Sequence, residues 1–173
     1  IYESNIPHDD NSKKYANDFL SLLCQDWEAE AKKAEAFDVR VVHTRFGVIF
    51  AKEGGAMLKI LPPFKMGVGG KLGSGEQMVS WIHIEDLLRA VEFIIKTPSI
   101  SGSVNFTTPY PLSNIEQTKI LGRVLKRPTF FRVPSFLIKL IFGEGAHVVL
   151  DSKEVYPTKL RENGFEFHYE KFE

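Results

Sequence analysis

The stretch from Thr44 to Asp86 decides the fold of this chain. It opens with TRFGVI at 44–49, continues through GGAMLK at 54–59, LPPF at 61–64 and GVGGKLGSG at 67–75, and closes with SWIHIED at 80–86. Eight of the chain's thirteen glycines lie between positions 47 and 75. This density indicates a backbone that bends sharply or approaches a neighbour closely. A long surface loop would also explain it, but an arginine precedes the stretch and a His/Asp pair follows it.

The charge and cysteine content of the chain limit the classes of protein to which it could belong. The 173 residues hold 22 basic and 22 acidic side chains, so the net charge is zero. This balance predicts no nucleic-acid partner and no membrane partner, and no apolar run reaches the ~20 residues that span a bilayer. The single cysteine, Cys24, allows a reducing compartment such as the cytoplasm. Its helical setting predicts a core thiol. The five histidines show no metal-ligand spacing, so no metal is expected.

Helical and extended patterns alternate before the central stretch. Apolar residues at spacings of three and four, including Phe19, Leu23 and Trp27, predict a helix over 16–36. The β-branched residues that follow predict a strand over 39–45, buried on both faces as in a parallel sheet. Helix followed by strand is half of a βαβ unit. The strand that should precede the helix is missing from this sequence.

The remainder of the chain continues the α/β pattern. Pro62 and Pro63 should end a helix that begins near residue 56. Ser113 and Glu116 form the sequence of a capping box, and Gly164 is typical of a helix end. Helices are predicted over 56–64, 84–96, 114–126, 134–142, 145–151 and 153–163, and strands over 79–83, 103–107 and 129–133.

Three side chains near the central stretch could carry chemistry. Arg45 ends a strand, where ligands bind in open α/β sheets, and could hold a phosphate or carboxylate. The alternative is a solvated arginine at a strand end. Asp86 is better explained as a helix N-terminal residue than as a catalytic acid. His83 shares a strand face with Trp81, and the two could line a pocket or pack against the glycine-rich stretch.

The residues of these motifs and their order in the chain resemble those of the atypical extended short-chain dehydrogenase/reductases. Within that family they are most similar to the NAD(P)-dependent, sugar-nucleotide-epimerase-like branch. The resemblance runs through nearly the whole chain. It rests on the segments 45–49, 54–57, 61–64, 73–87, 104–107, 121–128, 133–134 and 164–167.

The resemblance implies one α/β fragment over 1–173. It would comprise the carboxyl-terminal part of a Rossmann-type parallel sheet and a small α/β substrate-binding lobe, without the amino-terminal nucleotide-binding half. The full-length parent would bind NADP or NAD and a small-molecule carbonyl or sugar-nucleotide substrate. Arg45 and Tyr2 would contact the cofactor. The substrate side would be shaped by Gly54, Gly55, Gln77, Trp81 and His83.

One departure bears on mechanism. Extended members carry a Tyr-x-x-x-Lys pair on the helix that corresponds to the one holding Trp27 and Glu28 here. Alignment on Glu28 puts Leu20 and Cys24 at the positions of that pair. Tyr2 or Tyr15 could substitute, so no catalytic residue is assigned. The alternative function is a non-catalytic dinucleotide-binding or regulatory protein. A third is that the chain alone binds nothing and merely packs or oligomerises.

The fragment interpretation makes a structural prediction. The strand over 39–45 should have an unpaired or foreign neighbour on one side, because the strands that would flank it belong to the missing half. A homo-oligomer in which a second copy covers that edge is one solution, since bare strand edges invite pairing.

Overall fold

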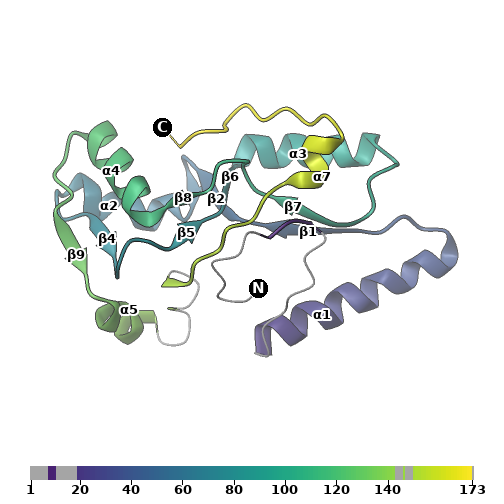
Figure 1. Cartoon of the computed structure of the whole chain (residues 1–173), viewed down its shortest axis with the longest axis horizontal. Helices are drawn as coiled ribbons and strands as arrows, with labels where there is room; N and C mark the ends of the chain where they lie inside the picture. The colour runs from purple at the N-terminus through teal and green to yellow at the C-terminus, as the bar shows by residue number, and fades with distance from the viewer. Residues whose placement is uncertain (1–7, 11–18, 143–145, 147–149, 173) are drawn as a thin grey trace.

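The structure is a computed structural model of the chain and describes residues 8–10, 19–142, 146 and 150–172. Short strands and helices alternate along them (Figure 1). Parallel pairing recurs in three of the strand pairs. The predicted α/β class with parallel strands is therefore confirmed.

The longest strand pair carries the main core. Strand β1 (Val42–Phe46) runs parallel to β7 (Gly102–Phe106) along their whole lengths. Helix α3 (Ile84–Lys96) presents apolar residues at spacings of three and four, and α7 (Thr158–Glu162) lies beside β7 (Figure 1). The buried members of this core are Ile82, Leu87, Ala90, Ile94, Ile100, Val104, Phe106, Leu160 and Phe165.

A second, smaller core lies under a three-stranded sheet. Strand β2 (Val48–Ala51) pairs in parallel with β6 (Trp81–His83) and in antiparallel with β3 (Gly54–Gly55). Gly55 has a φ of 63°, which glycine adopts without strain. The buried residues of this core are Phe50, Trp81 and Leu112.

The glycine-rich residues build part of a small lobe rather than a long loop. Strand β4 (Gly70–Leu72) runs parallel to β9 (Phe131–Val133). A Cβ at Gly70 would lie 2.0 Å from the Phe131 carbonyl oxygen, so the approach requires glycine. The rest of the lobe is α2 (Met57–Lys65), α4 (Asn114–Leu125), α5 (Ser135–Phe142) and the antiparallel pair of β5 (Met78–Val79) with β8 (Leu112–Ser113).

The first helix projects from the sheet with its apolar face in water. Helix α1 (Phe19–Lys32) continues into a 3₁₀ turn, η1 (Lys33–Phe37). Of the α1 residues only Ser21 is buried. Cys24 is exposed, so the core-thiol prediction was wrong. The helix predicted from this periodicity is confirmed, but none of the described residues covers its apolar face.

Strand β1 has the edge that the fragment interpretation requires. Among the described residues it pairs with β7 alone. It begins three residues later than predicted, at Val42. Its side chains are half-buried or exposed rather than buried on both faces, because a parallel sheet needs layers on both sides to bury it.

Two predicted boundaries were wrong within the lobe. Pro62 and Pro63 lie inside α2, which continues to Lys65. The carbonyls that lose a donor belong to Leu58 and Lys59, both exposed to water, so the prolines are tolerated. The single strand predicted over 79–83 is divided into β5 and β6, which pair in different sheets.

The helix predicted over 153–163 is also shorter than expected. Only Thr158–Glu162 is helical, and Val155 forms a parallel bridge with His8. The Lys153 N–H donates to the Met78 carbonyl at 3.0 Å, so tertiary partners replace helical ones. Gly164 ends α7 as predicted, with a φ of 84°. The helix predicted over 145–151 lies largely outside the described residues.

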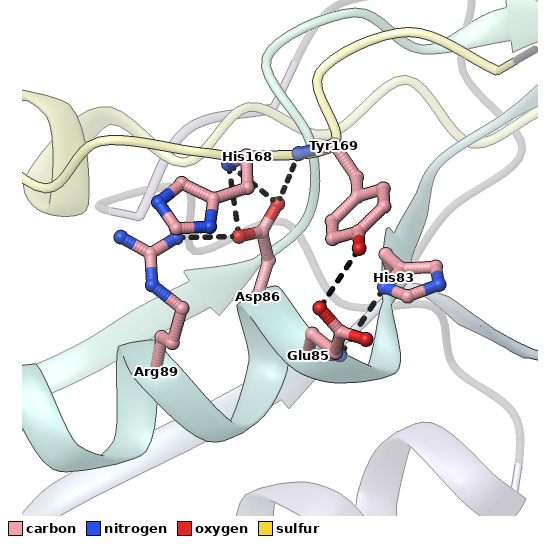
Figure 2. Close-up of polar contacts among 6 residues, drawn as sticks. All are labelled: His83, Glu85, Asp86, Arg89, His168 and Tyr169. Atoms are coloured by element: carbon pink, nitrogen blue, oxygen red, sulfur yellow. Dashed lines mark hydrogen bonds and ion pairs between the residues drawn. The ribbon is translucent and has the colours of Figure 1, made fainter.

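A buried carboxylate closes the fold (Figure 2). Asp86, in the first turn of α3, is fully buried. It accepts hydrogen bonds from Arg89 Nη1 at 2.7 Å and from the backbone N–H groups of His168 and Tyr169 at 3.0 and 2.7 Å. We call residues 165–172 the carboxyl-terminal strap. The strap thus crosses the start of α3, where the helix dipole also favours a negative charge.

The strap reaches both cores. Phe165 belongs to the main core. The Phe172 ring lies 5.2 Å from the ring of Phe50 and 5.4 Å from that of Trp81, centroid to centroid, in the second core. Between them, the Tyr169 ring stacks on His83 at 3.8 Å. One segment therefore joins the two cores along the outside of α3.

We expect Asp86→Ala to lower the free energy of unfolding by about 2–4 kcal/mol, because it removes a buried carboxylate and leaves two strap N–H groups without their acceptor. Urea unfolding measures the loss, and amide hydrogen exchange at His168 and Tyr169 should accelerate. Glu92→Ala is the control, since it breaks only an exposed pair with Lys96 on the same helix. Equal losses for the two variants would contradict the anchoring role.

The capping box of α4 gives a second prediction. Ser113 caps the helix, and its backbone N–H and hydroxyl donate to Glu116, which lowers the pKa of that carboxyl. Ser113→Ala should therefore cost about 1 kcal/mol at neutral pH. The part of this contribution that comes from the Ser113 hydroxyl donating to the Glu116 carboxylate is present above the ordinary value of about 4.3 and is lost as the pH falls through the lowered folded value. The bond from the Glu116 N–H to the same hydroxyl remains. Urea titrations at neutral pH and near pH 3 test this against Ser99→Ala, at an exposed serine. A pH-independent difference would contradict it.

Candidate functional site

A cavity opens where the two main parallel strands end. Its volume is about 300 Å³. Arg45 and Phe46 are the last residues of β1, while Asn105 and Thr107 stand at the carboxyl end of β7. Ligands of open α/β sheets bind at this edge. The remaining lining residues are Gly47, Val48, Met78, Val79, Ser80, Asp151, Lys153 and Val155.

Arg45 stands at the rim in a bidentate ion pair with α1. Its Nε and Nη2 donate to the two carboxylate oxygens of Glu28, each at 2.8 Å. Both side chains are half-buried, so solvent screens the pair less than an exposed one. The guanidinium is planar and held at two points, which gives it one orientation beside the cavity.

Gly47 lets the chain turn from β1 into β2 at the cavity wall. A Cβ there would lie 2.7 Å from the Ser80 carbonyl oxygen. The Gly47 N–H donates to the Phe106 carbonyl at 3.1 Å, and the Val48 N–H donates to that of Ser80 at 2.8 Å. These two bonds join the sheet of β1 and β7 to the sheet of β2 and β6, so the wall is rigid at this point.

Polar side chains of the wall hold the segment that follows residue 152. The Ser80 hydroxyl donates to the Lys153 carbonyl at 2.7 Å and accepts from the Val155 N–H at 2.8 Å. Thr107 Oγ1 donates to the Val155 carbonyl at 3.1 Å. These bonds place Asp151 and Lys153, which are far away in sequence, on the cavity wall.

Of the nominated residues that the structure describes, only Arg45 lines the cavity. Tyr2 and Tyr15 lie outside the described residues. Gly54 and Gly55 form β3, the outer strand of the three-stranded sheet. Gln77 is buried, and its Nε2 donates to the Leu72 carbonyl at 3.1 Å.

Trp81 and His83 also have structural surroundings. Trp81 packs in the second core, and its buried Nε1–H has no acceptor among the described residues. His83 caps α3, with Nδ1 accepting from the Glu85 N–H at 3.3 Å, and its ring lies against Tyr169 (Figure 2). Asp86 anchors the strap, while the cap itself is His83.

Sequence reasoning missed most of the cavity wall. Asn105 and Thr107 could have been found by the rule that nominated Arg45, because they end the strand predicted over 103–107. Asp151 and Lys153 gave no such signal, since residues 145–163 were interpreted as helices. Within the part of the chain that the structure describes, no three metal-binding side chains gather and no helix is long and apolar enough to cross a membrane.

The cavity fits one end of a dinucleotide rather than the whole of it. Its volume lies at the lower end of the ~300–1,000 Å³ of ligand pockets. Its wall offers a fixed guanidinium, an ammonium and apolar surface from Phe46, Val48 and Val79. The glycine-rich turn that holds a pyrophosphate at a helix N-terminus has no counterpart in the sequence, where no G-x-G-x-x-G follows a strand.

Known proteins resemble the chain over nearly its whole length. A family model described as "Domain of unknown function (DUF1731)" matches residues 133–173. The chloroplastic homologue of epimerase family protein SDR39U1 from Arabidopsis thaliana is 44% identical over 161 residues, which are 93% of this chain and 46% of that protein. An epimerase family protein of Staphylococcus haemolyticus is 46% identical over 152 residues, 88% of this chain and 51% of that protein. The chain spans about half the length of these curated relatives.

Solved structures give the same result in three dimensions. Human epimerase family protein SDR39U1 (isoform 2) with NADPH superposes with a TM-score of 0.87 and 31% identity, over 96% of this chain and 57% of that one. The nucleoside-diphosphate sugar epimerase from Corynebacterium glutamicum gives 0.73 and 29%, over 96% and 32%. The relatives and these neighbours agree: over the half of the curated relatives that it spans, the chain is similar to epimerase family proteins.

Proposed function

We propose that this chain supplies the substrate-facing wall of an NAD(P)(H) site in a longer epimerase- or reductase-like protein. The observation that carries the proposal is the cavity at the carboxyl ends of β1 and β7, with Arg45 fixed at its rim. The human neighbour is a complex with NADPH. When bound, a nicotinamide would supply or accept the hydride in exchange with a carbonyl compound.

The residues of this chain would bind and orient. Arg45, held by Glu28, would contact the cofactor at the rim, and Phe46 and Val48 would exclude water from the reacting end. Thr107 and Ser80 would keep the wall rigid through the hydrogen bonds already described. Asn105 would add the bond that its Nδ2–H donates to the Tyr156 carbonyl at 3.0 Å. Gln77, Trp81, His83, Gly54 and Gly55 would shape the substrate side from behind this wall.

Arg45 gives the direct test. In a longer protein that joins this chain to a nucleotide-binding half, Arg45→Ala should weaken NADPH binding by about 1.5–3 kcal/mol, the range of a charge-assisted hydrogen bond. Calorimetric titration measures it. Glu28→Gln should reproduce part of the loss, because it removes the charge that orients the guanidinium. Lys32→Gln on the same helix is the control. Unchanged NADPH affinity with a normal melting curve would remove Arg45 from the site.

The 173-residue chain alone should bind NADPH no more tightly than the millimolar range and show no turnover. One charge-assisted contact contributes a few kcal/mol at most, while association costs at least ~4 kcal/mol of lost freedom. Fluorescence or calorimetric titration of the purified chain measures this. A micromolar dissociation constant would show that the residues present already suffice.

The second candidate is a non-catalytic dinucleotide-binding or regulatory role. Leu20 and Cys24, at the Tyr-x-x-x-Lys positions, are both exposed on α1. Among the described tyrosines, Tyr156 and Tyr169 each donate to a glutamate, which raises their pKa values. A tyrosine that delivers a proton needs the opposite shift. Cofactor binding without oxidation of NADPH by any carbonyl substrate would favour this candidate.

A further inference from the structure

The balanced charge of the chain conceals an uneven distribution. Residues 54–75 and 117–142 contain no acidic side chain, although the whole chain has 22. Both segments belong to the small lobe. Their nine basic residues are Lys59, Lys65, Lys71, Lys119, Arg123, Lys126, Arg127, Arg132 and Lys139.

One side of the lobe joins this charge to exposed apolar side chains. We call residues 123–140, which comprise the end of α4, strand β9 and most of α5, the basic edge; it lies on the left in Figure 1. Phe130, Phe136 and Leu140 are 78, 67 and 80% exposed. The rings of Phe130 and Phe131 lie 4.6 Å apart between centroids in a tilted arrangement, so these two aromatic side chains form a pair. Large apolar side chains gathered at a surface indicate a contact site.

The charges of the basic edge are not neutralised within the fold. Arg123, Lys126, Arg127 and Arg132 are exposed, and none forms an ion pair with any described residue. The register of β4 and β9 even places Lys71 directly opposite Arg132. Like charges in that position destabilise a sheet. Within α4, the one acidic residue, Glu116, stands at the other end of the helix and is engaged in the capping box.

We propose that the basic edge docks on the surface of an anionic lipid bilayer. Interfacial segments combine Phe and Leu on one side with Lys and Arg on the other, and they lie on a membrane without spanning it. Basic residues near an anionic leaflet add attraction to the buried apolar surface. The exposed aliphatic side chain of Leu140 favours lipid over nucleic acid, which is bound through phosphate contacts and, in single strands, through stacking of bases on aromatic rings. This role is independent of the cavity at β1 and β7.

Helix α1 provides an internal contrast. Its exposed apolar face includes Trp27, which is 65% exposed. The surrounding charges are mainly acidic, with Asp26, Glu28 and Glu30 against Lys32. Glu28 and Glu30 are paired with Arg45 and Lys33, so this helix offers an anionic surface no excess of positive charge. Apolar exposure alone therefore does not define the proposed docking site, and Trp27 serves as a matched control.

Vesicle flotation of the 173-residue chain tests the proposal. The chain should float with vesicles of phosphatidylcholine and phosphatidylglycerol but not with phosphatidylcholine alone. It should be released at an ionic strength of about 1 M, where the Debye length is roughly 3 Å. Arg127→Gln should weaken the association about fivefold, and Leu140→Ser about tenfold. Trp27→Ser and Lys32→Gln should leave it unchanged, and circular dichroism checks that every variant is folded.

Several results would overturn the proposal. Equal flotation with both kinds of vesicle, or none with either, would exclude an anionic lipid surface. Loss of flotation in Trp27→Ser but not in Leu140→Ser would move the contact to α1. Binding of a single-stranded oligonucleotide without vesicle binding would assign the basic edge to nucleic acid. Self-association that Leu140→Ser abolishes, without flotation, would assign it to a second copy.

Discussion

The buried carboxylate of Asp86 is the constraint on which the arrangement of this chain depends. A charge without water must find donors, and α3 can supply only Arg89. The other donors are backbone N–H groups of the strap, more than eighty residues away. The hydrogen bonds from these N–H groups to Asp86 hold the strap across α3. In this position Phe165 packs in one core, Phe172 packs in the other, and Tyr169 stacks on His83. A second buried carboxylate acts similarly, because Asp10 accepts from the backbone N–H groups of Asn105 and Lys159.

The cavity also depends on side chains that hydrogen-bond the backbone of a distant segment. The hydroxyls of Ser80 and Thr107 bond the backbone of Lys153 and Val155, and residues 153–155 are not helical. Lys153 and Asp151 thereby reach the wall at which β1 and β7 end. Gly47 joins the two sheets there, since any side chain would collide with the Ser80 carbonyl. The candidate site is thus a junction of three distant segments around the ends of two strands.

Two apolar surfaces are left uncovered, and their charges differ. The exposed apolar residues of α1 lie on a helix that also carries Asp26, Glu28, Glu30 and Lys32. The charged residues of the basic edge are all cationic, and one of them, Arg132, lies opposite Lys71 of β4 in the strand register. A fold that keeps like charges together on its surface gives up some stability, and an external anion would restore it. A net charge of zero cannot reveal such a separation, because it sums over the whole surface.

The sequence by itself determined the α/β class, the family resemblance, the helices over 84–96 and 114–126 with the Ser113–Glu116 box, and the stop at Gly164. Each depends on residues close together in the chain, through periodicity, capping or turn geometry. It also nominated Arg45, because strand ends can be recognised locally. Only the tertiary structure decided that Trp81 and Gln77 are buried supports, that Asp86 anchors the strap, that residues 153–157 are not helical and that Cys24 is exposed. These outcomes depend on partners far away in sequence, whose hydrogen bonds and packing override local preference.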